Sequence, residues 1–273
     1  MFDYHVHTTR SIDCNTPIEA PCKVAIARGL SEIAFTDHVD HEPADDGFGF
    51  YDYEGYCEDI ERARDRFGDR LVILAGAEVD FNTRIAGDVE RFLSGHQFDF
   101  AIGSVHYGDA GEIIFPEYFS IRSLDDVLPP YYEQIHAAVE TGWFDTIGHL
   151  DLPKRYAPPS AGTYDPLRYT GSLRPIFASM IDRQLSFEIN TSGLRQAPKA
   201  SMPGPQIVSL YQSMGGALIT LGSDSHVPKS IGAGMERTLD MLCLCGIHHI
   251  SSFRQRQYTQ VSITDLRARN QGD

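Results

Sequence analysis

The chain opens with MFDYHVHTTRSID, residues 1–13, and this stretch decides how the rest of the sequence is interpreted. Residues 2–7 alternate in the manner of a β-strand. Alternation puts side chains two positions apart on one face, so His5 and His7 point the same way at the end of the strand. Two imidazoles in that arrangement are the start of a metal site. One His-x-His pair by itself more often marks a surface strand with solvated imidazoles, so the interpretation depends on the rest of the chain.

Length and composition favour one large domain. The chain has 273 residues, of which 42% are apolar, enough for one α/β barrel or two small domains. No internal repeat and no long linker is found, and we therefore expect a single domain over residues 1–273. Met1 leads directly into a strand, so we do not expect a signal peptide. No apolar run approaches the ~18 residues of a membrane span. Five irregularly spaced cysteines suit reduced thiols, so we expect a cytoplasmic protein that does not bind membranes.

The net charge limits the classes of partner that the protein is expected to bind. A net charge of −15 with scattered basic residues disfavours nucleic acid, because an extended phosphate backbone needs a basic stripe. A small anionic substrate is compatible with this charge, because bound metal ions reverse the local field. The sequence indicates no particular oligomeric state.

Seven strand-like runs alternate with helical patterns. The predicted strands cover residues 2–7, 32–36, 71–79, 98–104, 144–148, 185–190 and 217–221, and the predicted helices cover 16–29, 53–67, 130–141, 173–183 and 205–214. For the first helix, Thr16, Pro17 and Glu19 have the spacing of a capping box. A further strand is expected at 258–263, and residues 40–55 read as a loop over the site. The alternation predicts parallel βα units that form a barrel or an open sheet.

Chemically active side chains recur where these strands end. Six of the eleven histidines end strand-like runs or closely follow them: His5, His7, His38, His106, His149 and His226. Three carboxylates accompany them: Asp13, Glu78 and Asp224. Barrel enzymes collect their chemistry at the C-terminal ends of strands, where these groups would converge. A lone Glu in the apolar run LVILAGAEV costs several kcal/mol unless it is paired or bound to a cation. Any one of these histidines is more often an ordinary residue, but the whole set predicts a metal centre.

This set resembles the PHP (polymerase and histidinol phosphatase) family of metal-dependent phosphoesterases. The resemblance runs from residue 3 to about 235 and rests on His5-x-His7, Thr36-Asp37-His38, Glu78, Ser104-Val105-His106, Gly148-His149 and Ser223-Asp224-Ser225-His226. It implies a distorted (β/α)7 barrel with three divalent metal ions. Carried over by position, the first metal takes His5, His7, Glu78 and Asp224; the second takes Glu78, His106 and His149; the third takes Asp13, His38 and His226. Such ligands suit Zn²⁺, Mn²⁺ and Fe²⁺ alike.

Within that family the histidinol-phosphatase branch is the nearest resemblance. Its marks are residues 148–155, GHLDLPKR, and 188–195, EINTSGLR, which suggest Arg155 and Arg195 as phosphate ligands. A guanidinium fork matches phosphate oxygens, which agrees with that role. The implied reaction is hydrolysis of L-histidinol phosphate, in histidine biosynthesis, by in-line attack of a metal-activated hydroxide. Glu78 and Asp224 serve this chemistry as metal ligands, and His41 is a candidate to bind phosphate or protonate the leaving alcohol.

A small amino-alcohol ester would also need an acid for its cationic part, and three acidic residues are candidates: Asp40, Glu42 and Glu117. Other functions stay open. The protein could act on another small phosphate monoester or on a nucleotide, or it could be an exonuclease, which the absence of a basic face disfavours. A metallo-amidohydrolase also carries His-x-His on a barrel strand, but often with a bridging lysine that has no suitable counterpart here. A non-catalytic domain with a decayed site should have lost one or more ligands, and the full ligand set here disfavours that alternative.

Overall fold

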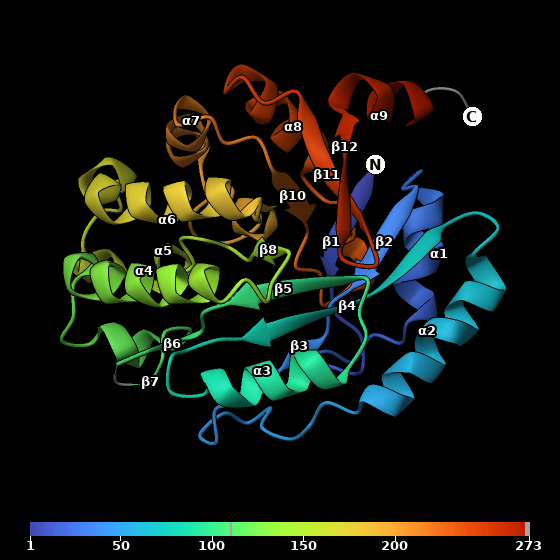
Figure 1. Ribbon diagram of the computed structural model, residues 1–273, viewed down its shortest axis with the longest axis horizontal. Helices are drawn as coiled ribbons and strands as arrows, with labels where there is room; N and C mark the ends of the chain where they lie inside the picture. The colour runs from blue at the N-terminus through green and yellow to red at the C-terminus, as the bar shows by residue number, and fades with distance from the viewer. Residues whose placement is uncertain (110, 271–273) are drawn as a thin grey trace.

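A parallel sheet curves into a nearly closed barrel with helices on its outside (Figure 1). The structure is a computed structural model that describes residues 1–109 and 111–270. Around the barrel the strands follow in the order β1 (Phe2–Val6), β2 (Glu32–Phe35) with β3 (His38–Val39), β4 (Val72–Asp80), β5 (Phe100–Ser104), β8 (Thr146–Ile147), β9 (Ser186–Asn190) and β10 (Ile219–Gly222). β2 and β3 both pair with β4, so together they occupy one strand position.

The barrel closes between its last and first strands. Val6 at the end of β1 forms a parallel bridge with Ser225, just after β10. The N–H of His7 donates to the carbonyl of Ser225 at 3.0 Å, and the N–H of Ser225 donates to the carbonyl of His5 at 3.3 Å. Of the two predicted arrangements, the barrel is therefore the correct one. Closure also brings the His5-x-His7 pair beside the loop that carries Asp224.

Helices surround the barrel and protect its strands. They are α1 (Glu19–Ala27), α2 (Tyr53–Phe67), α3 (Ala86–Gly95), α4 (Leu124–Thr141), α5 (Pro153–Tyr156), α6 (Thr170–Arg183), α7 (Pro205–Ser213), α8 (Met235–Leu244) and α9 (Ile263–Asn270). Short 3-10 turns are found at Pro116–Phe119, Pro159–Ala161, Pro166–Tyr169, Ser192–Leu194 and Pro228–Ser230. α4 and α6 lie side by side in Figure 1. None of the helices among the described residues is long and apolar enough to cross a membrane.

Two hairpins extend the barrel at opposite ends. β6 (Tyr107–Gly108) and β7 (Gly111–Glu112) follow the C-terminal end of β5. β11 (His249–Arg254) and β12 (Gln257–Ser262) cover the N-terminal ends, where the Phe253 ring packs 5.0 Å from the Phe100 ring and the Tyr4 hydroxyl accepts from the Phe253 N–H at 3.1 Å. The hairpin β11–β12 closes the bottom of the core and leaves the other mouth open.

The seven predicted strands are confirmed, with ends displaced by at most two residues. Three helix starts differ from the prediction by three residues or more, and α6 begins at Thr170 rather than 173. α4 begins at Leu124 rather than 130, because Ser123 and Asp126 form a capping box that starts the helix before its two prolines. α1 begins at Glu19 without a side-chain cap, and the Thr16 hydroxyl instead donates to the carbonyl of His226 at 2.9 Å. The residue expected to cap a helix therefore helps to hold a loop of the site.

Candidate metal centre

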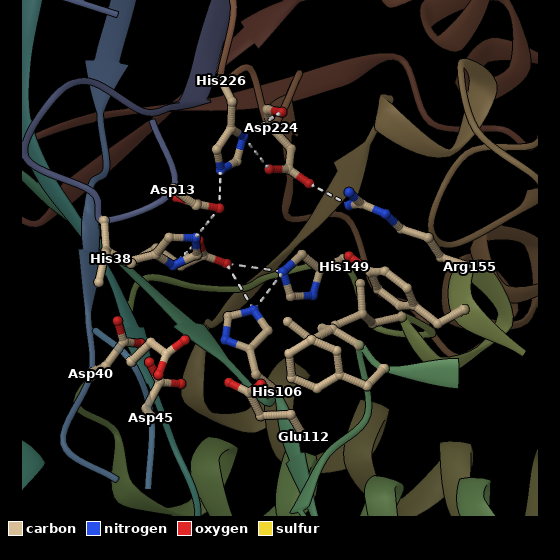
Figure 2. A pocket seen from close by; sticks show the side chains of 17 residues that line it. Asp13, His38, Asp40, Asp45, His106, Glu112, His149, Arg155, Asp224 and His226 are labelled. Atoms are coloured by element: carbon tan, nitrogen blue, oxygen red, sulfur yellow. Dashed lines mark hydrogen bonds and ion pairs between the residues drawn. The ribbon is translucent and has the colours of Figure 1, made fainter. Parts of the chain in front are cut away.

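All nine predicted ligands gather at the C-terminal mouth of the barrel, and those labelled in Figure 2 face one another across a pocket. Each is carried by a strand or by the residues directly after it. β1 carries His5 and is followed by His7 and the loop of Asp13; β3 begins with His38, and β4 carries Glu78. The residues after β5, β8 and β10 supply His106, His149, Asp224 and His226. Because parallel strands deliver their ends to one rim, groups 221 positions apart in sequence meet here.

Glu78 is at the centre of this group and is 1% exposed. Its Oε1 lies 2.9 Å from Nε2 of His149, and its Oε2 lies 3.0 Å from Nε2 of His5 and 3.1 Å from Nδ1 of His38. The Ser104 hydroxyl donates to Oε1 at 2.6 Å. Burial acts to raise the pKa of Glu78, but the charges of His5 and His38 outweigh it and keep the pKa well below its usual range. A carboxylate with a lowered pKa and histidines near both oxygens is suited to bind two cations.

Four overlapping groups of side chains have ligand atoms within 4.8 Å of one another: His5, His7 and Asp224; Glu78, His106 and His149; His7, His38 and His226; and His38, Asp40 and His106. The second group is the second metal set predicted from the sequence, and the first contains three of the four ligands predicted for the first metal, without Glu78. For the third set, Oδ2 of Asp13 lies 3.0 Å from Nε2 of His226 and 3.8 Å from Nε2 of His38. The structure thus brings the predicted ligands together, with Asp40 as an additional neighbour.

Several of the ligand atoms are buried with few polar contacts, which suits them to bind a cation. Nε2 of His7 is buried and has no hydrogen-bond partner among the described residues, and the buried Nε2 of His5 and His226 and Oε2 of Glu78 have only ion-pair contacts with other ligands. A buried polar atom without a partner costs on the order of 1–3 kcal/mol. Imidazole nitrogens and carboxylate oxygens are ligands of Zn²⁺ and of related divalent ions. The residues present therefore fit a metal centre.

A second layer of carboxylates holds the ligands in place. Oε1 of Glu188 lies 2.7 Å from Nδ1 of His5, and Oε2 of the same residue accepts the N–H of His149 at 2.9 Å. Oδ1 of Asp80 accepts the N–H of His106 at 3.0 Å. Such partners fix the ring orientation of metal-binding histidines. Their roles were not predicted, although Glu188 and Asp80 share the signal that singled out Glu78, a charge within a buried strand.

A pocket of about 230 Å³ opens above the ligands. The metal ligands form one side, and a second group of carboxylates, Asp40, Asp45, Asp46 and Glu112, forms another (Figure 2). Apolar side chains complete the wall: Ile12, Ile114, Phe115, Leu152 and Tyr156. The pocket therefore combines a metal centre, an acidic wall and an apolar wall around a volume suited to a small molecule.

The sequence model of the PHP domain matches residues 3–192. The chain belongs to the PHP-domain family. The match covers more than half of the chain and includes seven of the nine predicted ligands; Asp224 and His226 lie beyond it. The family resemblance inferred from the sequence is thus confirmed, and so is the barrel that it implied.

Relatives of this PHP domain cover nearly its full length. The probable histidinol-phosphatase of Deinococcus radiodurans is 30% identical over 243 residues, which cover 85% of this chain and 88% of the relative. The histidinol-phosphatase of Lactococcus lactis is 27% identical over 253 residues, covering 92% and 93%. A crystal structure of histidinol phosphate phosphatase from Lactococcus lactis, complexed with zinc, L-histidinol and phosphate, superposes with a TM-score of 0.87 at 25% identity and covers 94% of this chain and 98% of that one.

The three predicted phosphate-site residues of this PHP domain lie in different surroundings. Arg155 lines the pocket, with Nη1 2.9 Å from Oδ2 of Asp224. Arg195 does not line it; its guanidinium donates to the carbonyls of Thr191 at 3.4 Å and Ser223 at 2.6 Å, and burial lowers its pKa. His41 is also outside the lining.

The His41 ring packs against the Phe92 ring at 5.3 Å. Its Nε2 is buried without a hydrogen-bond partner in the described part of the chain, and burial lowers the pKa of the imidazole. The structure does not bring His41 to the metal ligands, so its role in catalysis stays a prediction.

Proposed function

We propose that this PHP domain hydrolyses L-histidinol phosphate to L-histidinol and inorganic phosphate, the phosphatase step of histidine biosynthesis. The observation that carries the proposal is a full set of nine metal-ligand side chains at the mouth of a barrel that superposes on a histidinol phosphate phosphatase along almost the whole chain. That relative was solved with zinc and both products of the reaction. The pocket here has the size and the mixed lining that a small phosphate ester requires.

The metal centre, in this proposal, holds three divalent ions of zinc, manganese or iron in the sets inferred from the sequence. When bound, such ions act as Lewis acids and lower the pKa of coordinated water. Glu78 would contribute a carboxylate common to the first and second sets, and Asp224 would contribute an oxygen near His7, whose Nε2 lies 3.6 Å from Oδ1 of Asp224. Three divalent charges outweigh the three carboxylates Asp13, Glu78 and Asp224, which leaves a local positive charge for a phosphate dianion.

Arg155 is the arginine that we propose to contact the phosphate. Its guanidinium is already in the pocket, where Nη1 lies 2.9 Å from Oδ2 of Asp224 and 3.3 Å from the Ser192 hydroxyl. Anchoring by Asp224 leaves other N–H groups of the fork to donate to phosphate oxygens. Arg195 lies behind this layer and holds the carbonyl of Ser223, next to Asp224. We propose that it supports the phosphate site through that loop.

The acidic wall is suited to the cationic part of the substrate. The Tyr107 hydroxyl lies 2.9 Å from Oδ2 of Asp45 and 2.9 Å from Oε1 of Glu112. Burial and the neighbouring Asp45 raise the pKa of Glu112 to about 7. An ammonium or imidazolium group here would relieve the repulsion between the two carboxylates. Of the three acids that the sequence offers for this role, Asp40 lines the pocket, whereas Glu42 pairs with an arginine, Arg84, at 3.0 Å.

We expect Glu112→Gln to raise KM for L-histidinol phosphate by roughly 5- to 30-fold, the equivalent of about 1–2 kcal/mol for a lost charge-assisted contact. KM for a phosphate ester without a cationic group should change less than twofold. Steady-state kinetics on both esters test this. Glu117→Gln is the matched control, because Glu117 is exposed and does not line the pocket. An equal rise in KM for both esters would show that Glu112 does not select the cationic group.

The proposed function is tested by phosphate release from L-histidinol phosphate beside other small phosphate monoesters, nucleotides and a 3′-labelled oligonucleotide. We expect a preference in kcat/KM for L-histidinol phosphate and no cleavage of the oligonucleotide. Greater activity on another monoester would keep the site and replace the substrate. If metal-loaded protein hydrolysed none of them, the phosphatase proposal would be wrong.

A further inference from the structure

The hydroxyl of Ser11 makes contacts with three groups around the metal centre. Ser11 lies in the loop after β1, is 1% exposed and has no place among the predicted ligands. Its Oγ donates to Oδ1 of Asp37 at 2.8 Å and accepts the N–H of His38 at 3.0 Å. The same oxygen lies 3.0 Å from Nδ1 of His7. One small side chain therefore links β1 to the segment that carries His38.

The proton positions in this network can be assigned by counting donors. A serine hydroxyl has one hydrogen to donate and two lone pairs that accept. Asp37 is fully buried, and its carboxylate also accepts the Thr8 N–H at 2.6 Å and the Thr8 hydroxyl at 2.8 Å. Since the Ser11 hydrogen is directed to Asp37, its oxygen can only accept from His7. Nδ1 of His7 therefore carries the hydrogen in this arrangement.

The other nitrogen of the His7 ring points into the metal centre. Nε2 is buried, has no hydrogen-bond partner among the described residues, and lies 3.5 Å from Oε2 of Glu78 and 3.6 Å from Oδ1 of Asp224. With the hydrogen on Nδ1, Nε2 presents a free lone pair, which is the form that binds a metal ion. A neutral imidazole can place its hydrogen on either nitrogen, so something has to select the form.

We propose that Ser11, held by Asp37, is a positioning residue that keeps His7 in the tautomer and orientation required for metal binding. Glu188 contacts the corresponding Nδ1 of His5 directly, at 2.7 Å. His5 and His7 are thus oriented by different partners, and each partner also accepts the backbone N–H of a further ligand, that of His149 for Glu188 and that of His38 for Ser11. The inference rests on the metal-binding part of the proposed function and is independent of the substrate.

The test is zinc affinity of the full chain, measured by chelator competition after the protein has been stripped of metal. Losing the outer partner of a metal-binding histidine typically weakens binding 10- to 100-fold, and we expect Ser11→Ala to weaken the site served by His7 by that factor. Ser11→Thr, which keeps the hydroxyl, should restore most of the affinity. Ser186→Ala is the matched control, because Ser186 is also buried but donates to the carbonyl of Asp145 at the opposite end of the barrel, at 2.6 Å.

A second measurement detects the tautomer without metal or activity. In ¹⁵N spectra of the imidazole groups of metal-free protein, His7 should be protonated at Nδ1 in the wild type and in Ser186→Ala. In Ser11→Ala a population protonated at Nε2 should appear. If Ser11→Ala fails to fold, Ser11→Cys replaces it, since a thiol is similar in size but a weak donor and acceptor. Wild-type zinc affinity with an unchanged His7 tautomer in either folded variant would overturn the proposal. Such a result would not contradict the proposed hydrolysis of L-histidinol phosphate. Equally, a failure to hydrolyse L-histidinol phosphate would not contradict the role of Ser11 in metal binding.

Discussion

Glu78→Gln is expected to reduce kcat for L-histidinol phosphate by at least about 10³-fold. Replacing an outer partner of a metal ligand usually costs 10- to 100-fold, and the loss of a ligand shared by two ions should exceed that. Glutamine keeps the shape of Glu78 but removes its charge. One of its two terminal atoms becomes an NH₂ group, which cannot ligate a cation.

The contacts of Glu78 explain why a single atom matters so much. Both carboxylate oxygens are in use, Oε1 towards His149 at 2.9 Å and Oε2 towards His5 at 3.0 Å. Whichever way the glutamine amide is turned, an NH₂ group faces one of these histidines. The variant should therefore lose metal content together with activity, which elemental analysis of the purified protein would show.

The matched control for this variant is Glu32→Gln. Glu32 is also a buried barrel glutamate, but its carboxylate accepts from the Tyr4 hydroxyl at 2.5 Å and pairs with Arg254 at 3.0 Å, away from the metal ligands. Its kcat should stay within about threefold of wild type. Wild-type turnover by Glu78→Gln, with metal retained, would mean that Glu78 does not bridge.

The barrel strands could be predicted from the sequence because they are short, continuous apolar runs, as expected of parallel strands buried on both faces. Elements outside that rule were missed. α3 was missed although Val89, Phe92 and Leu93 have helical spacing, because this apolar stripe is short and only Val89 is fully buried. β11 contains two buried serines, Ser251 and Ser252, which interrupt its apolar run. The start of α4 was hidden because its two prolines suggested a boundary where the capping box at Ser123 had already begun the helix.

The metal ligands were predictable for a different reason. A histidine or carboxylate directly after an apolar strand can be predicted to reach the site without knowing which strands are neighbours. This is because every strand of a parallel barrel ends at the same rim. The partners of these ligands depend on contacts across the barrel, such as that of Glu188 with His5, 183 positions apart. Ser11 has no distinguishing pattern at all, and its role emerges only when the donors around its oxygen are counted.

Metal removal is the second change for which we expect a large effect, and it acts on stability as well as on activity. Ions bound to the folded chain at a thousandfold excess over Kd stabilise it by about 4 kcal/mol for each site. In proteins of 150–250 residues, 1 kcal/mol corresponds to roughly 2–4 °C in Tm. Emptying even one site should thus lower Tm by about 10 °C, while phosphate release falls to background.

Without metal ions, the buried carboxylates of the metal centre have no bound cations to balance their charge. Glu78 and Asp224 would depend on protonated histidines, and Nε2 of His5 and His7 would lack a ligand. Calorimetry of chelator-treated protein, followed by reloading with Zn²⁺, Mn²⁺ or Fe²⁺, measures this directly, and the ion that best restores both Tm and turnover is the preferred one. Glu78→Gln serves as the control, since its Tm should respond much less to the chelator. Full activity in protein shown to be free of metal would contradict a metal-dependent mechanism.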